Sequence, residues 1–257
     1  AERRPDWFEA NGAAIKLNVE LGAKAEARRL AEAFAEKSPR NAAAWIVVGD
    51  VASTDKRYAD AAAAYARAYA IRPSAIAAAR ESMSRGAAGL ERPDQPLLTW
   101  LDRNPGDLGV RRLLSEFYLR GNAFSDAAAQ LEKIVAAAPN DVGALNNLAW
   151  ALTKSDPKRA ETYARRANAI DPQSPPIADT LGWLLVQSKR YAEAKPFLEQ
   201  AAKGMPKEPS VQYHLAAALA GAGDKSAAKQ LLDSVLSGDS QFAERAAASQ
   251  LAQELSQ

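Results

Sequence analysis

The chain contains no cysteine, a single histidine and two methionines among its 257 residues. Without cysteine it can form no disulfide and offers no thiolate as a nucleophile or a metal ligand. One histidine excludes motifs that bind a metal through two histidines, and it leaves little for histidine-based acid–base chemistry. We therefore predict a protein that is not an enzyme, with no catalytic residue, no cofactor and no metal site.

Long apolar runs and a strong charge of one sign are lacking as well. No stretch approaches the roughly 18 consecutive apolar residues that cross a bilayer, so no membrane span is expected in this fragment. The 33 Lys and Arg against 31 Asp and Glu give a formal net charge of only +2. That balance does not provide the basic surface by which proteins bind nucleic acid, so no nucleic-acid partner is expected.

The sequence is instead rich in alanine, its most frequent residue, and its prolines are evenly spaced. Alanine is the strongest helix former and adds little bulk, so it favours closely packed helices. Intervals of 34, 32, 34, 33 and 34 residues separate Pro39, Pro73, Pro105, Pro139, Pro172 and Pro206. A fixed period of this length indicates a repeat built from a pair of helices.

Each interval holds the pattern of two helices. Before three of the prolines, apolar residues stand at i, i+4 and i+7, one face of a helix. These residues are Ala61, Tyr65 and Ala68; Ala127, Leu131 and Ile134; Ala194, Leu198 and Ala201. An earlier helix repeats a large, a small and a large residue, as in Leu181, Gly182 and Leu185. The small residue predicts a close approach between neighbouring helices.

This pattern resembles the tetratricopeptide repeat (TPR), a 34-residue helix–turn–helix with the signature W-x2-L-G-x2-Y…A-x3-F…P. Residues 42–73 match the signature at Trp45, Val48, Gly49, Ala61, Tyr65, Ala68 and Pro73. The resemblance implies an all-α fold, the TPR α-solenoid. Such a solenoid is a right-handed superhelix, here of about seven antiparallel helix pairs followed by a C-terminal capping helix.

We expect the repeats to fill residues 1–238 and the capping helix and tail to fill residues 239–257. The third repeat departs from the pattern around residues 86–96, because Pro93 and Pro96 stand where its second helix is due. Proline is tolerated in the first turn of a helix but not inside it. This helix is therefore expected to be short and to begin near one of the two prolines, with a loosened layer there. The fifth repeat has a shortened turn that ends at Pro157.

The C-terminal half has a narrower resemblance. The strings NNLAWAL at 146–152 and DTLGWLL at 179–185, with the segment 211–236, are similar to bacterial TPR proteins associated with PEP-CTERM/exosortase systems. Those proteins are longer, are linked to extracellular polysaccharide production and are usually lipoproteins or periplasmic. The resemblance, together with a first residue that is not Met, implies a fragment of a periplasmic or outer-membrane-associated protein. A cytoplasmic location stays open.

Function in a helical solenoid is grafted onto the concave face, which is built from the first helix of each pair. Residues beside the buried small residue, and those one turn before and after it, are expected to face this groove. The predicted partner-binding groove consists of Arg112, Glu116, Arg120, Asn146, Trp150, Lys154, Asp179, Trp183, Gln187 and Tyr213. The three aromatic residues of this set fall on adjacent layers.

The groove residues also have ordinary structural interpretations. Trp150 and Trp183 either stack on each other and close the groove, or present their faces to a peptide or a sugar ring. The basic and amide residues either receive a carboxylate or are solvated charges. We favour solvated charges, because the Lys and Asn arrangement of TPR domains that bind acidic peptide tails is not reproduced. The unique His214 is interpreted as structural or solvated, since no Ser-His-Asp spacing accompanies it.

We therefore predict a non-enzymatic scaffold that binds a protein or peptide partner in the concave groove, in envelope or exopolysaccharide assembly. Two alternatives stay open. One is a glycan-binding module that stacks a polysaccharide on the groove aromatics, and the other is a regulatory TPR region of a larger enzyme.

Overall fold

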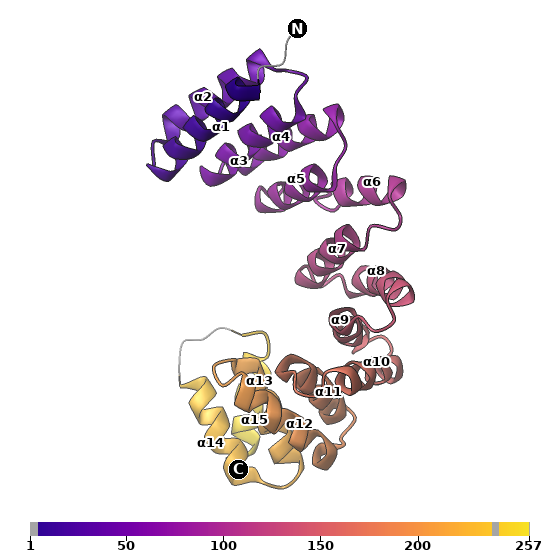
Figure 1. Ribbon diagram of the computed structural model, residues 1–257. Helices are drawn as coiled ribbons and strands as arrows, with labels where there is room; N and C mark the ends of the chain where they lie inside the picture. Colours follow the sequence, from indigo (N-terminus) through magenta and orange to yellow (C-terminus); the bar gives the residue numbers. More distant parts are fainter. Residues whose placement is uncertain (1–4, 238–241, 257) are drawn as a thin grey trace. The chain divides into compact units, whose positions relative to one another are not determined.

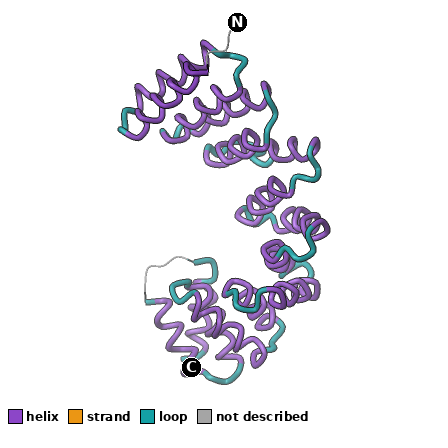
Figure 2. The backbone as a smooth tube through the Cα atoms, in the orientation of Figure 1, coloured by secondary structure: helices purple, strands orange, loops and turns teal. Residues whose placement is uncertain are grey.

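The structure, a computed structural model, describes the backbone of residues 5–237 and 242–256, with side chains from residue 12 onward. Within these ranges the chain is entirely helical and contains no strand (Figure 1). Figure 2 shows the helices joined by loops. The chain divides into two compact units, residues 1–117 and 118–257. Stacked helices throughout confirm the predicted all-α repeat architecture.

The first unit contains six helices and most of a seventh. Helices α1 to α6 pack in sequence, ending with the contact of α5 and α6, and α1 also touches α3. The bounds are α1 Pro5–Glu20, α2 Lys24–Lys37, α3 Ala42–Thr54, α4 Tyr58–Ile71, α5 Ala75–Ala87, α6 Gln95–Arg103 and α7 Leu108–Arg120.

The second unit contains the end of α7 and eight further helices. The helices from α8 to α15 pack in sequence, and α9, α11 and α13 also touch in turn. One core cluster of buried side chains, largely Ala and Leu, runs through these helices. The bounds are α8 Phe124–Ala137, α9 Val142–Leu152, α10 Pro157–Ile170, α11 Pro175–Gln187, α12 Tyr191–Gly204, α13 Pro209–Gly221, α14 Lys225–Leu236 and α15 Arg245–Glu254.

The terminal helix covers the open end of the second unit's core. Ala248 is fully buried and Leu251 packs against the core cluster. An end repeat has no neighbour on one side, so a final helix of this kind shields its apolar face. The expected start of this cap falls partly on residues 238–241, which lie outside the described residues.

The core positions inferred from the repeat pattern are buried as predicted. The nine residues at i, i+4 and i+7 of the second helices are at most 3% exposed. The small residues of the first helices stand where helices approach closely. A Cβ added to Gly49 would lie 2.4 Å from a ring carbon of Tyr65, and one added to Gly182 would lie 2.5 Å from Cγ of Leu198. At these two positions even alanine has no room.

The turn inside most repeats contains one residue in the left-handed region of backbone space. This residue recurs near the 34-residue period, at Gly22, Lys56, Gly89, Asn122, Lys189 and Gly223. The fifth repeat has no such residue among those described. Its helix α10 instead begins directly at Pro157, with the side chain of Asp156 accepting a hydrogen bond from the amide of Arg159. Proline at the first helical position permits this shorter turn.

The evenly spaced prolines also tie neighbouring repeats together. The carbonyl oxygens of five of the six accept hydrogen bonds from side chains of following helices. The donors are Trp45, Arg111, Arg166, Gln200 and Gln212. Because a proline ends each repeat, these bonds join the loop between repeats to the helices packed beside it.

The third repeat has a short second helix. Helix α6 spans nine residues, with Pro96 in its first turn, whereas α4 and α8 span 14 residues each. The connection before α6 contains two residues with positive φ, Gly89 at 66° and Arg92 at 47°.

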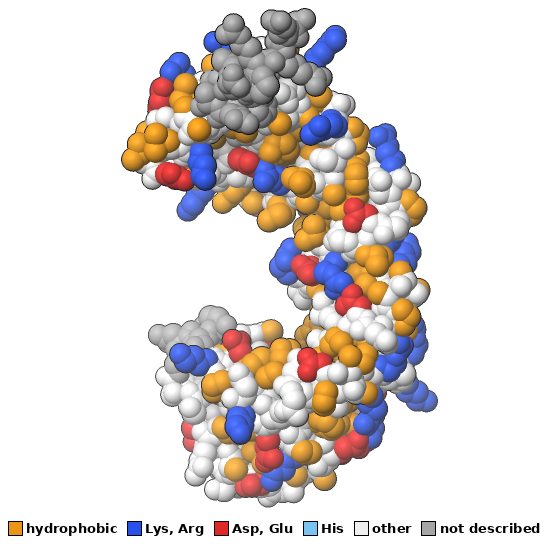
Figure 3. Space-filling view, viewed as in Figure 1, with side chains coloured by type: hydrophobic (Ala, Val, Ile, Leu, Met, Phe, Trp, Pro, Cys, Tyr) orange, Lys and Arg blue, Asp and Glu red, His pale blue; other side chains and the backbone are white. Residues whose placement is uncertain are grey.

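On the face shown in Figure 3, basic and acidic side chains are interspersed over both units.

Candidate partner-binding site

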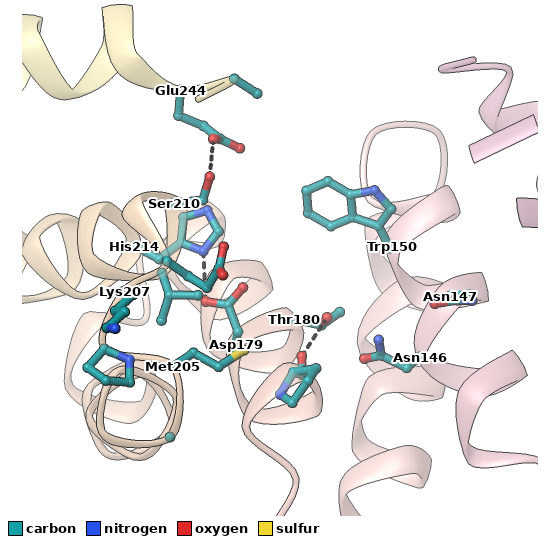
Figure 4. Close-up of a pocket in the computed structure, with 16 residues that line it drawn as sticks. Asn146, Asn147, Trp150, Asp179, Thr180, Met205, Lys207, Ser210, His214 and Glu244 are labelled. Atoms are coloured by element: carbon teal, nitrogen blue, oxygen red, sulfur yellow. Dashed lines mark hydrogen bonds and ion pairs between the residues drawn. The ribbon is translucent and has the colours of Figure 1, made fainter. Parts of the chain in front are cut away.

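A pocket of about 760 Å³ opens on the second unit, on the face formed by the first helices of three successive repeats. Its walls come from α9, α11 and α13, from the turn between α12 and α13, and from residues 243–244 ahead of α15. Figure 4 shows the side chains that surround it. Polar and aromatic side chains of the lining include those of Asn146, Trp150, Asp179, Ser210, His214 and Glu244.

Each of these helices buries one face in the core, so the residues on another face point toward the pocket. On α9, Leu145, Leu148 and Ala149 are fully buried, so Asn146 and Trp150, four residues apart, share a different face. The side chain of Trp150 is 37% exposed. In Figure 4 its indole lies across the pocket from Ser210 and His214. Ser210 and His214 are likewise one helical turn apart on α13.

The centre of the site is a hydrogen-bonded pair from two repeats. Nδ1 of His214 lies 2.8 Å from Oδ1 of Asp179, and the His214 side chain is 2% exposed. A carboxylate only accepts hydrogen bonds, so the imidazole carries a proton on Nδ1 and donates it to Asp179. The ring of His214 stacks on that of Trp183, with 4.1 Å between centroids and 17° between planes. These contacts fix the orientation of the imidazole.

Two polar atoms at the pocket have no hydrogen-bond partner among the described residues. They are Nε2 of His214 and Oδ1 of Asn146, and both are shielded from water. A buried polar group without a partner is costly and uncommon in folded proteins. Both residues line the pocket, so the unpaired atoms indicate a place where a ligand supplies the missing hydrogen bonds.

Carboxylates surround the rest of the pocket. Ser210 donates a hydrogen bond of 2.8 Å to Oε2 of Glu244, which joins α13 to the segment ahead of α15. Burial, followed by the charge of Glu244, raises the pKa of Tyr213 above its ordinary value. Asp179 and Glu208 add two further carboxylates to the lining, and Lys207 adds one ammonium.

Asp179, His214 and Ser210 do not form the triad used for nucleophilic catalysis. That chemistry needs the serine hydroxyl to donate to the second ring nitrogen of the histidine. Here Ser210 donates to Glu244 instead, and Nε2 of His214 is unpaired. Nor does any group of three or more His, Cys, Asp or Glu in the described ranges gather as a metal site would require. The arrangement is suited to binding through hydrogen bonds, charge and an aromatic face.

The structure brings together three of the ten predicted groove residues. Asn146, Trp150 and Asp179 line the pocket. Arg112 and Glu116 lie on α7 in the first unit, while Arg120 on the same helix is counted with the second unit. Lys154, two residues after the end of α9, and Gln187, the last residue of α11, are exposed and outside the pocket lining.

Two of the three predicted groove aromatics have a different role. Tyr213 is 8% exposed and belongs to the core cluster, so its prediction as a surface residue is wrong. Trp183 is partly buried, packs against that cluster and lies 5.6 Å from the ring of Tyr213. Successive layers of a solenoid rotate slightly. On α13, His214 therefore lines the pocket in place of Tyr213, which is the repeat equivalent of Asn146 and Asp179 and lies one position earlier.

Sequence reasoning missed several pocket residues. His214 was interpreted as structural or solvated; it is indeed buried, but it also lines the pocket with an unpaired nitrogen. Its equivalents one and two repeats earlier, Thr180 and Asn147, line the pocket too. This periodicity is a signal that the sequence contained. Glu244 lies beyond residue 238, where the seven predicted repeats end, so the repeat pattern used above did not place it.

Stacked helix hairpins, with a pocket on the first helices of three repeats, define a helical-repeat protein. The tetratricopeptide repeat family matches residues 13–76 and 101–175 in one form and residues 185–253 in another. The chain belongs to the tetratricopeptide repeat family. Within the described ranges, no helix is both long enough and apolar enough to cross a membrane.

Similar proteins share this fold. A TPR repeat-containing protein of Pseudomonas aeruginosa is 26% identical over 137 residues, which make up 50% of this chain and 23% of that protein. A TPR protein from Parabacteroides merdae superposes with a TM-score of 0.66 at 14% identity, covering 97% of this chain and 99% of that one. PilF of Pseudomonas aeruginosa superposes with a TM-score of 0.62 at 17% identity, covering 84% and 96%.

Proposed function

We propose that this chain is a non-catalytic interaction module that holds a segment of a partner protein in the pocket between α9, α11 and α13. TPR proteins are in general scaffolds for protein partners, which supports the choice of partner class. The observation that carries the proposal is the pair of buried, unpaired polar atoms at His214 and Asn146 beside the exposed indole of Trp150. Aromatic residues in such positions are frequent binding hot spots.

The volume of the pocket suits a short segment and not a whole domain face. About 760 Å³ lies within the range of small-ligand pockets, enough for one or two side chains with their backbone. The rest of a bound segment would extend along the first helices on either side. The pocket then acts as an anchor point, and flanking residues of the segment add contact area.

A peptide-display selection tests this function. The whole chain is immobilised, random peptides are selected on it, and their dissociation constants are measured by fluorescence anisotropy for the wild type and for Trp150→Ala. Selected peptides are expected to lose roughly thirtyfold or more in affinity with the variant, as for a hot spot worth about 2 kcal/mol. Peptides that bind both proteins equally, or no selected peptide at all, would overturn the assignment of a peptide to this pocket.

Glycan binding is the second candidate, and Trp150 together with the carboxylates and amides of the lining favours it. The glycan-binding module predicted from the sequence would stack a sugar on three aromatic rings, those of Trp150, Trp183 and Tyr213. Tyr213 is buried and Trp183 is covered by His214, so Trp150 is left as the platform. A glycan array probed with the wild type and Trp150→Ala separates the two candidates. We retain envelope or exopolysaccharide assembly, with a periplasmic or outer-membrane-associated location, as the proposed setting; it is supported only by the resemblance of the NNLAWAL and DTLGWLL strings and of the segment 211–236.

A further inference from the structure

The pocket has an excess of negative charge. Three carboxylates line it, those of Asp179, Glu208 and Glu244, against the single ammonium of Lys207. Among the described residues, no Lys or Arg forms an ion pair with any of these three carboxylates; the one pairing found is that of Asp179 with His214. A recess lined by charge of one sign concentrates ligands of the opposite sign. The charge therefore favours a cationic occupant.

The unpaired atoms call for an occupant that donates hydrogen bonds, as a cationic side chain does. Oδ1 of Asn146 can only accept hydrogen bonds. Nε2 of His214 also accepts in the neutral ring, because the hydrogen bond to Asp179 places the proton on Nδ1. A ligand satisfies both atoms only if it donates at least two hydrogen bonds. A carboxylate or a phosphate presents acceptors and would leave them unpaired.

The chain uses this combination elsewhere with its own arginines. In the first unit the guanidinium of Arg67 lies over the ring of Trp45, 4.0 Å from its centroid. Arg80 on α5 donates to the carboxylate of Asp50 on α3 and lies over the ring of Tyr65. An aromatic face beside a carboxylate thus holds an arginine within the repeats. In the second-unit pocket, Trp150 and the three carboxylates offer the same groups without an arginine from the chain.

We propose that the pocket binds a cationic side chain of the partner segment, and specifically an arginine. The planar guanidinium has an aromatic face to stack on at Trp150 and hydrogen-bond acceptors on both sides of the pocket, at Asn146 and at His214, within the field of the three carboxylates. A lysine ammonium carries the same charge but neither stacks as a plane nor donates as a fork. That a protein supplies this arginine rests on the proposed function. The preference of the pocket for an arginine side chain rests on the chemistry of its lining and is independent of that function.

Small blocked amino acids test the pocket independently of any partner. The probes are N-acetyl-arginine methylamide, its neutral isostere N-acetyl-citrulline methylamide, the lysine and glutamate analogues, and a methyl galactoside. Each is titrated into the ¹⁵N-labelled full chain, and the indole resonance of Trp150 and the amides of α9, α11 and α13 are followed. The arginine probe is expected to shift these resonances saturably and to bind about tenfold more tightly than citrulline, the gain of a charge-assisted over a neutral interaction.

Matched variants show whether the charge of the pocket is responsible. Glu208→Gln combined with Glu244→Gln keeps the shape and the hydrogen-bonding atoms, and is expected to weaken the arginine probe by about tenfold. Glu199→Gln combined with Glu132→Gln removes the same charge from helices α12 and α8, outside the pocket lining. That control pair is expected to leave binding within about twofold, because salt screens distant charges.

Each contrary result has a separate meaning. Equal binding of arginine and citrulline, equal effects of the two variant pairs, or shifts caused by glutamate or the galactoside in place of arginine would overturn the cation site. Display-selected peptides that need Trp150 but contain no essential cation would overturn it too, while the proposed function stands. An arginine probe that binds as expected, when no peptide is selected, would leave the cation site in place and overturn the protein partner.

Discussion

The imidazole of His214 lies flat against the indole of Trp183, with 4.1 Å between ring centroids and 17° between ring planes. The edge of the same imidazole donates to Asp179, which stands one helical turn before Trp183 on α11. One residue of α13 is therefore held by two residues of the preceding repeat. Trp183 supports the site from behind, whereas Trp150 faces the pocket.

The two tryptophans should respond differently to truncation. Trp183→Ala removes a half-buried ring that packs on His214 and the core, and we expect it to lower the free energy of unfolding by about 3 kcal/mol. Trp150→Ala removes a more exposed ring, and we expect a loss of about 1 kcal/mol or less with the larger effect on binding. Urea unfolding of both variants followed by circular dichroism checks the order; a greater loss for Trp150→Ala would contradict it.

The repeat period was the most informative part of the sequence. The spacing of the prolines and the residues at i, i+4 and i+7 predicted helix pairs and their core, because burial in a solenoid depends on local periodicity. The close approach between helices at Gly49 and Gly182 was predicted from the same repeat pattern. The start of α6 follows from local proline chemistry as well, since Pro96 fits only a first turn.

The site was less predictable, for two physical reasons. Each layer rotates relative to the one before, so equivalent positions drift across the face, and Tyr213 turns into the core while His214 replaces it. In addition, Glu244 precedes the terminal helix α15, in the part of the chain that was assigned to a cap and tail and was not aligned to the repeat pattern. The three predicted groove residues that line the pocket, Asn146, Trp150 and Asp179, come from α9 and α11.

The close approach at Gly182 gives a second prediction. An alanine Cβ there would lie 2.5 Å from Cγ of Leu198, which is fully buried. Gly182→Ala is therefore expected to reduce the free energy of unfolding by about 1–3 kcal/mol through overpacking. Gly12→Ala is the matched control, because a Cβ on this helical glycine meets nothing within 4 Å. The control should gain up to about 1 kcal/mol from helix propensity; equal denaturation midpoints would contradict the packing argument.

A cluster of ion pairs between α10 and α12 gives a third prediction, for acid stability. Arg165 and Arg190 each donate to both Glu161 and Glu193. Burial raises the pKa of Glu161, but the hydrogen bonds from the two arginines outweigh it and the pKa lies below its ordinary value. Hydrogen bonds from the same two arginines to Glu193 lower the pKa of that carboxyl as well.

The sign of the pH effect follows from these lowered pKa values. The unfolded carboxyls take up protons at higher pH than the folded ones, so the cluster stabilises the fold fully above the ordinary carboxyl pKa of 4.5. This contribution is lost as the pH falls through the lowered values. Glu161→Gln with Glu193→Gln should flatten the decline of unfolding free energy between about pH 5 and about pH 3. Urea melts across this range test it, with Glu199→Gln as control; a decline as steep as in the wild type would disprove it.

The left-handed turn residues give the last prediction. Lys56 and Lys189 have φ of 59° in turns where the equivalent positions of three other repeats, 22, 89 and 223, are glycine. A side chain with a Cβ is strained in this region by about 1 kcal/mol, and glycine is not. Lys56→Gly and Lys189→Gly should therefore each stabilise the chain, despite the greater entropy that glycine gives the unfolded state. Ser155→Gly, in the one turn without a left-handed residue among those described, is the control and should destabilise. Thermal melts of the three variants decide the matter: a fall in melting temperature for both lysine variants would show that the turn strain is relieved by other contacts of these side chains.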